Sequence, residues 1–152
     1  MEQEQQRGQK AVFAAAHNSH AAKFSSYDSM GSLLDKELGS GYYAIGTDFY
    51  SASCDLPGKD GKRIERLIYS RDPVAKAVKQ LGLERCWLDF AEIPESSPLC
   101  EQLHDYCFMG SIGDIWWPMM RLIPQSYRSF QPPAVLYDSM IFVTHPQPSG
   151  VM

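Results

Sequence analysis

The sequence predicts an α/β fold, with a mostly parallel sheet and flanking helices. Three observations lead to this prediction: an apolar run near the start of the chain, helical periodicity after it, and further apolar runs that alternate with helical segments. The first run covers residues 11–16 and has polar residues on both sides. Such runs are typical of strands that are buried on both faces of a parallel sheet. We therefore expect a buried strand within residues 10–20.

A helix and a second strand are expected next. Apolar residues recur with helical spacing from Met30 to Leu38, Ser29 precedes them as an N-cap, and Gly39 follows them as a stop. Residues 41–50 are rich in aromatic and β-branched side chains, which favours a strand. Strand, helix and strand in this order form a βαβ unit, so we expect parallel strands joined by a right-handed crossover.

The same alternation is repeated in the middle of the chain. Residues 51–63 contain several turn-forming residues and are expected to form a loop before a short strand at residues 64–69. Asp72, which a proline follows, is typical of a helix start, and Gly82 is typical of its end. Residues 85–90 then return as a strand. This second alternation supports the α/β class.

The last third of the chain is less regular. Residues 99–107 are predicted to form a short helix and residues 135–144 a strongly apolar final strand. Between them, glycines and a proline interrupt residues 109–122, which hold Trp116 and Trp117. This segment is either an irregular loop that closes over the strand ends or a contribution of large side chains to the core.

Length and composition indicate one globular domain. The chain has 152 residues, of which 44% are hydrophobic and 21% charged, as is ordinary for a folded protein. We expect a flexible segment at residues 1–9, the α/β domain at residues 10–145 and a tail at residues 146–152. A net charge of −4 gives no basic patch for nucleic acid or an anionic membrane surface. With neither a secretory signal nor an apolar stretch long enough to span a bilayer, the sequence suggests a soluble, cytoplasmic protein.

The four cysteines are expected to be free thiols. Cys54, Cys86, Cys100 and Cys107 have spacings that match neither a zinc site nor a redox pair. Cys54 follows the second predicted strand, but nothing in its surroundings in the sequence indicates an activated nucleophile.

The polar residues that end the first apolar run form the candidate site. His17 and His20 flank Asn18 at the predicted carboxyl end of a strand, which is where open α/β sheets bind ligands. Imidazoles act as bases, acids or ligands near neutral pH. The alternative is that these histidines only form hydrogen bonds with loop backbone.

Several segments resemble the erythromycin esterase-like family, which includes proteins described as succinoglycan biosynthesis proteins. They are Ala-His-Asn-Ser-His at residues 16–20, Ser-Met-Gly-Ser-Leu-Leu at residues 29–34, and Tyr-Tyr-Ala-Ile-Gly-Thr-Asp-Phe at residues 42–49. Residues 87–90 and 136–143 resemble the later strands of the family, in the same order. The His-Asn-x-His element followed by Met-Gly is the most specific of these motifs.

The resemblance implies an enzyme that hydrolyses ester bonds, including the macrolactone of macrolide antibiotics, without a metal or other cofactor. A histidine would activate water as a general base while other groups hold the developing oxyanion. Carried over to this chain, His17 and His20 are the catalytic residues. Asn18, Met30 and Asp48 are assigned to binding the small-molecule ester or lactone substrate.

One element of the family is missing from the sequence. The principal base of the family lies upstream in a Gly-Glu-x-x-His-Gly element, which this chain does not contain. Residues 101–104 have the Glu-x-x-His spacing but lack the glycines. We therefore expect the carboxy-terminal part of a partial erythromycin esterase-like fold, a fragment without the upstream base that makes contacts with an amino-terminal portion.

Two alternatives to a metal-independent hydrolase stay open at this point. The first is a non-catalytic binding module that keeps the scaffold and the crevice. The second is metal-dependent hydrolysis at His17, His20 and Asp48, for which two histidines three residues apart are compatible with ligation but no third zinc ligand is apparent from the spacing.

Overall fold

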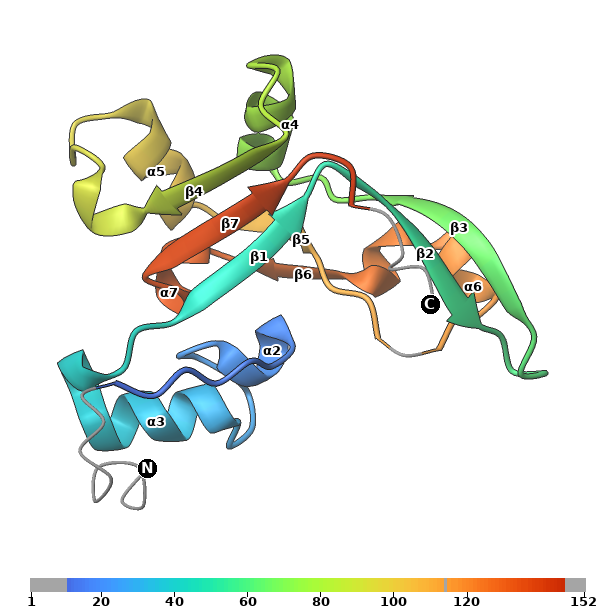
Figure 1. Cartoon of the computed structure of the whole chain (residues 1–152), viewed down its shortest axis with the longest axis horizontal. Coiled ribbons are helices and arrows are strands. Elements are labelled where there is room, and N and C mark those ends of the chain that lie inside the picture. The colour runs from blue at the N-terminus through green and yellow to red at the C-terminus, as the bar shows by residue number, and fades with distance from the viewer. Residues whose placement is uncertain (1–10, 114, 147–152) are drawn as a thin grey trace.

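A computed structural model describes residues 11–113 and 115–146. Its central sheet has three strands, β1 (Ile45–Phe49), β7 (Ser139–Val143) and β4 (Arg85–Asp89), in the order β1-β7-β4 (Figure 1). β1 and β7 are parallel, whereas β4 is antiparallel to β7. The α/β class is therefore correct, but the prediction of a mostly parallel sheet is wrong because this sheet is mixed.

Two antiparallel strand pairs accompany the central sheet. β2 (Ser51–Pro57) and β3 (Arg63–Tyr69) form a hairpin, and β5 (Cys107–Gly110) pairs with β6 (Arg128–Gln131). The hairpin corrects the expectation of a loop over residues 51–63. The turn-forming residues of that segment are confined to its end, where the Gly61 amide donates to the Gly58 carbonyl at 3.0 Å and Gly61 has a φ of 74°.

The two longest helices follow the sequence prediction. α3 (Met30–Leu38) starts at Ser29, whose hydroxyl accepts from the Ser32 amide in a capping box. α4 (Pro73–Gln80) starts at Asp72, whose carboxylate accepts from the Val74 amide at 2.7 Å. The remaining helices are short: α2 (Asn18–Ala21), η1 (Gly39–Gly41), η2 (Phe90–Glu92), α5 (Pro98–His104), α6 (Met119–Leu122), η3 (Pro124–Tyr127) and α7 (Pro133–Leu136). Among the described residues, no helix is long and apolar enough to cross a membrane.

The first apolar run is not a strand. Residues 11–17 have no regular secondary structure and pair with no strand of the described chain. Val12 is 48% and Phe13 is 85% exposed. Four of the six residues from Ala11 to Ala16 are alanine, which is depleted in strands and buries little apolar area. The βαβ unit that we expected to begin here is therefore absent.

Two apolar clusters form the core. The larger joins the central sheet to α4, α5 and α7, and its most buried members include Met140, Phe142 and Leu103. The smaller lies under the β2–β3 hairpin and contains Ile68 and Trp116. Trp116 is thus a core residue, as one of the two alternatives for residues 109–122 requires. Its neighbour Trp117 is 46% exposed and lies under the Lys59 ammonium, 4.4 Å from the ring centroid.

The Met-Gly pair of the family motif has a structural role at Gly31. A Cβ on Gly31 would lie 2.4 Å from the Ala21 carbonyl oxygen and 2.5 Å from that of Ala22, so α3 approaches the end of α2 at backbone distance. We expect Gly31→Ala to lower the free energy of unfolding by about 1–3 kcal/mol, because backbone atoms have to move. Chemical denaturation measures this change.

Gly113→Ala is the matched control for this prediction. A Cβ on Gly113 meets no described atom within 4 Å, so the substitution is expected to leave stability within about 0.5 kcal/mol of the parent. Equal effects of the two substitutions would contradict the close packing of α2 against α3.

Candidate active site

His17 is the N-cap of α2 and is fixed from both sides of its ring. Nδ1 lies 3.0 Å from the Ser19 hydroxyl and accepts from the Ser19 amide at 3.4 Å. Nε2 lies 3.0 Å from the main-chain carbonyl of Ile112. His17 therefore joins α2 to the segment after β5, which lies 95 residues further along the chain.

These contacts determine which nitrogen of neutral His17 carries the proton. A carbonyl oxygen only accepts hydrogen bonds, so Nε2 donates to Ile112. Nδ1 then keeps its lone pair and accepts hydrogen bonds from the amide and the hydroxyl of Ser19. The basic nitrogen of His17 is thus Nδ1, with a rotatable hydroxyl in front of it.

Asn18 attaches the site to the central sheet. Its Nδ2 donates to the Thr47 carbonyl at 2.6 Å, and its Oδ1 accepts from the Thr47 amide at 3.1 Å and the Thr47 hydroxyl at 3.0 Å. The Asn18 amide therefore pairs with β1 as a neighbouring strand would. Both polar atoms of the Asn18 side chain, Oδ1 and Nδ2, therefore face Thr47. The assignment of Asn18 to substrate binding stays a prediction.

His20 and Met30 both lie at the surface. His20 is exposed in the last turn of α2, and its ring forms no hydrogen bond with any described residue. Met30 is the first residue of α3 and is 37% exposed. Both side chains are accessible, and their roles in catalysis and substrate binding stay predictions.

Asp48 follows Thr47 on β1, but its carboxylate points into the protein interior. Asp48 is only 3% exposed and accepts from the Phe49 amide at 2.7 Å, the Gly110 amide at 3.1 Å and the Ser70 hydroxyl at 2.8 Å. Burial, and then the nearby Asp72 carboxylate, raise the pKa of Asp48 well above its usual value. In this structure Asp48 holds the end of β5, two residues before the carbonyl that fixes His17. Its contact with a substrate stays a prediction.

A cavity of about 190 Å³ adjoins the His17 turn. Asn18 and Ser19 form one side of it, and the end of β5, two residues of β6 and the end of α7 form the others. The lining includes Gly110, Ser111, Ser129 and Tyr137. The Tyr137 hydroxyl donates to the Asn18 carbonyl at 3.3 Å, and burial raises the pKa of Tyr137, so it stays a hydrogen-bond donor at neutral pH.

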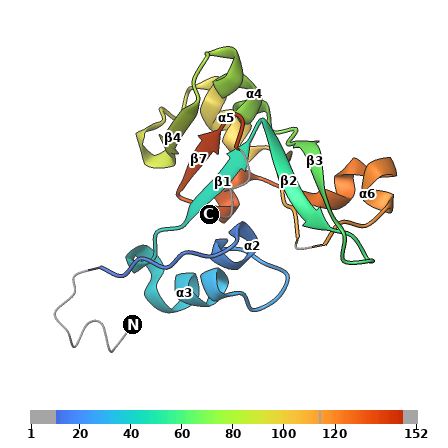
Figure 2. The same cartoon turned by 45° about the vertical axis from the view of Figure 1, so that its right-hand side comes forward.

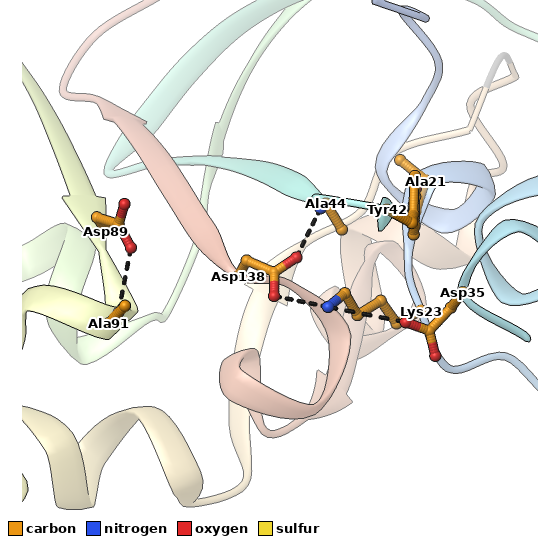
Figure 3. A network of polar contacts seen from close by, with 8 residues as sticks. All are labelled: Ala21, Lys23, Asp35, Tyr42, Ala44, Asp89, Ala91 and Asp138. Atoms are coloured by element: carbon orange, nitrogen blue, oxygen red, sulfur yellow. Dashed lines mark hydrogen bonds and ion pairs between the residues drawn. The ribbon is translucent and has the colours of Figure 1, made fainter. Parts of the chain in front are cut away.

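A polar network anchors the α2–α3 region to the start of β1 and β7 (Figure 3). Lys23 Nζ lies 2.6 Å from Asp138 and 3.7 Å from Asp35, and the other oxygen of Asp138 accepts from the Ala44 amide at 2.7 Å. The Tyr42 hydroxyl donates to the Ala21 carbonyl at 2.5 Å. These residues were not predicted as part of the site, and they hold the segment after α2 against the sheet.

The histidines lie in no metal cluster of the described chain. Among residues 11–113 and 115–146, no three His, Cys, Asp or Glu side chains are grouped so as to hold a metal ion. All four cysteines are free, as predicted. Cys54 lies within β2, where burial raises the pKa of its thiol, which lowers its thiolate fraction.

Comparisons with known proteins agree with the resemblance. A family model described as erythromycin esterase matches residues 1–145. A crystal structure of a Bacillus cereus protein is similar, with a TM-score of 0.74 and 17% identity, over 90% of this chain and 34% of that one. The structure of a succinoglycan biosynthesis protein gives a TM-score of 0.72 and 16% identity, over 90% and 33% of the two chains. At these identities the likeness concerns the fold alone, and the chain spans about a third of the length of both solved proteins.

Proposed function

The chain belongs to the erythromycin esterase family, and on this premise we propose that it acts as part of a hydrolase for ester or macrolactone bonds, with His17 as the base that activates water. The observation that carries the proposal is the orientation of the His17 ring. Nε2 donates to the Ile112 carbonyl, which leaves the Nδ1 lone pair facing the Ser19 hydroxyl, and Ser19 lines the cavity. A base held in one tautomer by a backbone acceptor is suited to proton transfer.

In the proposed reaction, water replaces the Ser19 hydroxyl at Nδ1, because that side chain rotates about one bond. Nδ1 takes a proton from the water as its oxygen bonds to the ester carbonyl carbon. The ester C–O bond then breaks, and the imidazolium returns the proton to the leaving alcohol, so the products are a carboxylic acid and an alcohol. His20, three residues further on, is proposed to assist from the exposed side of α2.

The proposal assigns oxyanion stabilisation to groups outside the described residues. Within the described part of the chain, the His17 ring forms hydrogen bonds only with Ser19 and Ile112, and neither offers a cationic donor. The solved proteins of similar fold are more than twice as long as this chain. We therefore propose that the chain supplies one part of a larger site and that full activity needs the other. With a macrolide antibiotic as substrate, the reaction would open its ring, and we place it in the cytoplasm.

A second candidate is a binding module that does not turn over its ligand. The specific observation in its favour is that both nitrogens of His17 already form hydrogen bonds within the fold. A histidine whose only role is to join α2 to the segment after β5 would have the same contacts.

Mass spectrometry of the purified chain with a macrolide lactone distinguishes the two candidates. If the chain is a hydrolase, the lactone gains the mass of one water at a rate proportional to protein concentration. p-Nitrophenyl butyrate serves as a simple ester, and heat-denatured chain serves as the blank. Saturable binding of the lactone without hydrolysis would favour the binding module. If the lactone is neither bound nor hydrolysed, macrolides are excluded as ligands under both candidate functions.

A further inference from the structure

A second and larger cavity lies at the opposite end of the molecule from α2. It has a volume of about 780 Å³ and opens between the end of α4, the start of β4 and the end of β7. Figures 1 and 2 both show these three segments together, away from α2 and α3. This volume is within the range of small-molecule sites. We call it the α4–β7 cleft.

Three basic side chains from three different elements line the α4–β7 cleft. Lys79 comes from α4, Arg85 is the first residue of β4, and His145 follows β7. Glu84 is the one acidic residue of the lining. Within the described chain, none of the three basic residues forms an ion pair with a carboxylate. The cleft therefore has an excess of basic groups, and a concave surface concentrates the resulting field.

Two of these side chains are held in place by the junction of β1 and β2. Lys79 Nζ lies 4.0 Å from the ring centroid of Tyr50, a cation–π contact. The same Tyr50 ring meets His145 edge-on at 5.9 Å. The Ser51 hydroxyl lies 2.6 Å from His145 Nδ1, so this hydrogen bond engages Nδ1 and not Nε2. Side chains that are already ordered lose less entropy when a ligand binds.

The base of the cleft is joined by backbone hydrogen bonds. The Thr144 amide donates to the Glu84 carbonyl at 2.9 Å, and the Thr144 hydroxyl donates to the Leu83 carbonyl. α4 ends at Gln80; Gly82, just beyond its C-cap, has a φ of 72°, and the Leu83 amide then donates to the Val78 carbonyl at 3.2 Å. The segment between α4 and β4 is therefore fixed against β7.

The position of the cleft is also typical of a ligand site. It lies where the parallel strands β1 and β7 end, and open α/β sheets bind ligands beyond the carboxyl ends of their parallel strands. Leu83 and Val143 add apolar surface to the lining. Arg85 offers a planar fork of donors that matches the oxygens of a carboxylate or phosphate.

We propose that the α4–β7 cleft binds a small organic anion, with its carboxylate or phosphate group at Arg85, Lys79 and His145 and its apolar part against Leu83 and Val143. This site is separate from His17, and the proposal does not depend on ester hydrolysis.

Isothermal titration of the intact chain with inorganic phosphate, phenyl phosphate and benzoate tests the proposal. Phenyl phosphate is expected to bind more tightly than inorganic phosphate, because only the former contacts the apolar part of the lining. Phenyl phosphate and benzoate differ in the anionic group, so the one that binds with the higher affinity identifies the group that the site prefers. Binding is expected to weaken as salt is added.

Arg85→Gln is expected to weaken binding of the preferred anion at least tenfold, and Lys79→Gln to weaken it to a smaller extent. Arg71→Gln is the matched control, since Arg71 is exposed and lies outside the lining, and it changes the net charge equally. Circular dichroism checks that each variant is folded. No saturable binding of any of the three anions, or equal losses in Arg85→Gln and Arg71→Gln, would overturn the proposal.

Discussion

Replacing His17 by asparagine is expected to lower ester hydrolysis by about 10²- to 10⁴-fold, the usual contribution of a general base. The expectation follows from the Nδ1 lone pair, which the bond from Nε2 to the Ile112 carbonyl leaves as the basic position. Asparagine is a suitable replacement because it is a strong N-cap and its side-chain oxygen is able to accept from the Ser19 amide at the start of α2. The melting temperature is therefore expected to change little. Initial rates with p-nitrophenyl butyrate or a macrolide lactone measure the effect.

His104→Gln is the matched control for this experiment. His104 is an exposed histidine at the end of α5, whose Nδ1 donates to the Cys100 carbonyl within its own helix at 2.8 Å. Its replacement is expected to leave the rate unchanged. Hydrolysis that survives in His17→Asn at the parent rate would show that His17 is not the base, and would leave its N-cap role as the explanation for its contacts.

The sequence predicts best those helices and strands that have local signals at their ends. α3 and α4 both have a side-chain cap at the start and a glycine at the stop, and the structure confirms both helices. β4 was also placed closely, over Arg85–Asp89. Its direction was not predictable, because parallel or antiparallel pairing depends on how the chain returns to the sheet and not on the residues of the strand.

The elements that sequence missed lack such signals. β5 and β6 have four residues each, too few to show a period of two, and they are separated by residues 111–127, whose described part contains only short helical segments. The run over residues 11–16 gave the opposite error: it is apolar by composition but mostly alanine, and it lies exposed outside the sheet.

The sequence predicted only part of the candidate site. His17 and Asn18 were singled out from a local motif, and the structure shows both in long-range contacts. The group that fixes the tautomer of His17 is the main-chain carbonyl of Ile112, and any residue type supplies a carbonyl. No side-chain pattern identifies such a partner, so only the fold reveals it. Gly31 illustrates the reverse case, because its place in the motif reflects helix packing.

Asp48→Ala is expected to lower the free energy of unfolding by about 3–5 kcal/mol, since three donors lose their buried acceptor. The amides of Phe49 and Gly110 and the hydroxyl of Ser70 all donate to this carboxylate, inside the protein. Urea denaturation measures the loss. A change below about 1 kcal/mol would contradict this account of the junction between β1 and β5.

Asp48 and the neighbouring Asp72 make the free energy of unfolding depend on pH. Asp72 is 1% exposed, and its Oδ2 has no hydrogen-bond partner in the described chain. Burial raises the pKa of Asp72, and burial together with Asp72 raises the pKa of Asp48. Since the folded state holds these protons more tightly than the unfolded state, their contribution to stability is full below the unfolded-state pKa, about 3.9. It is lost as the pH rises through the folded-state pKa values.

Asp72→Asn isolates this effect. Asparagine keeps the cap on the Val74 amide, and its NH₂ group replaces the unpartnered oxygen beside Asp48 with a donor. Relative to the parent, the variant is expected to gain about 1–2 kcal/mol at pH 7 and to lose stability less steeply as the pH rises from 4. Asp89→Asn, at the half-buried cap of η2, is the matched control and is expected to follow the parent curve. Parallel curves for the parent and Asp72→Asn would contradict a repulsion between the two buried carboxyls.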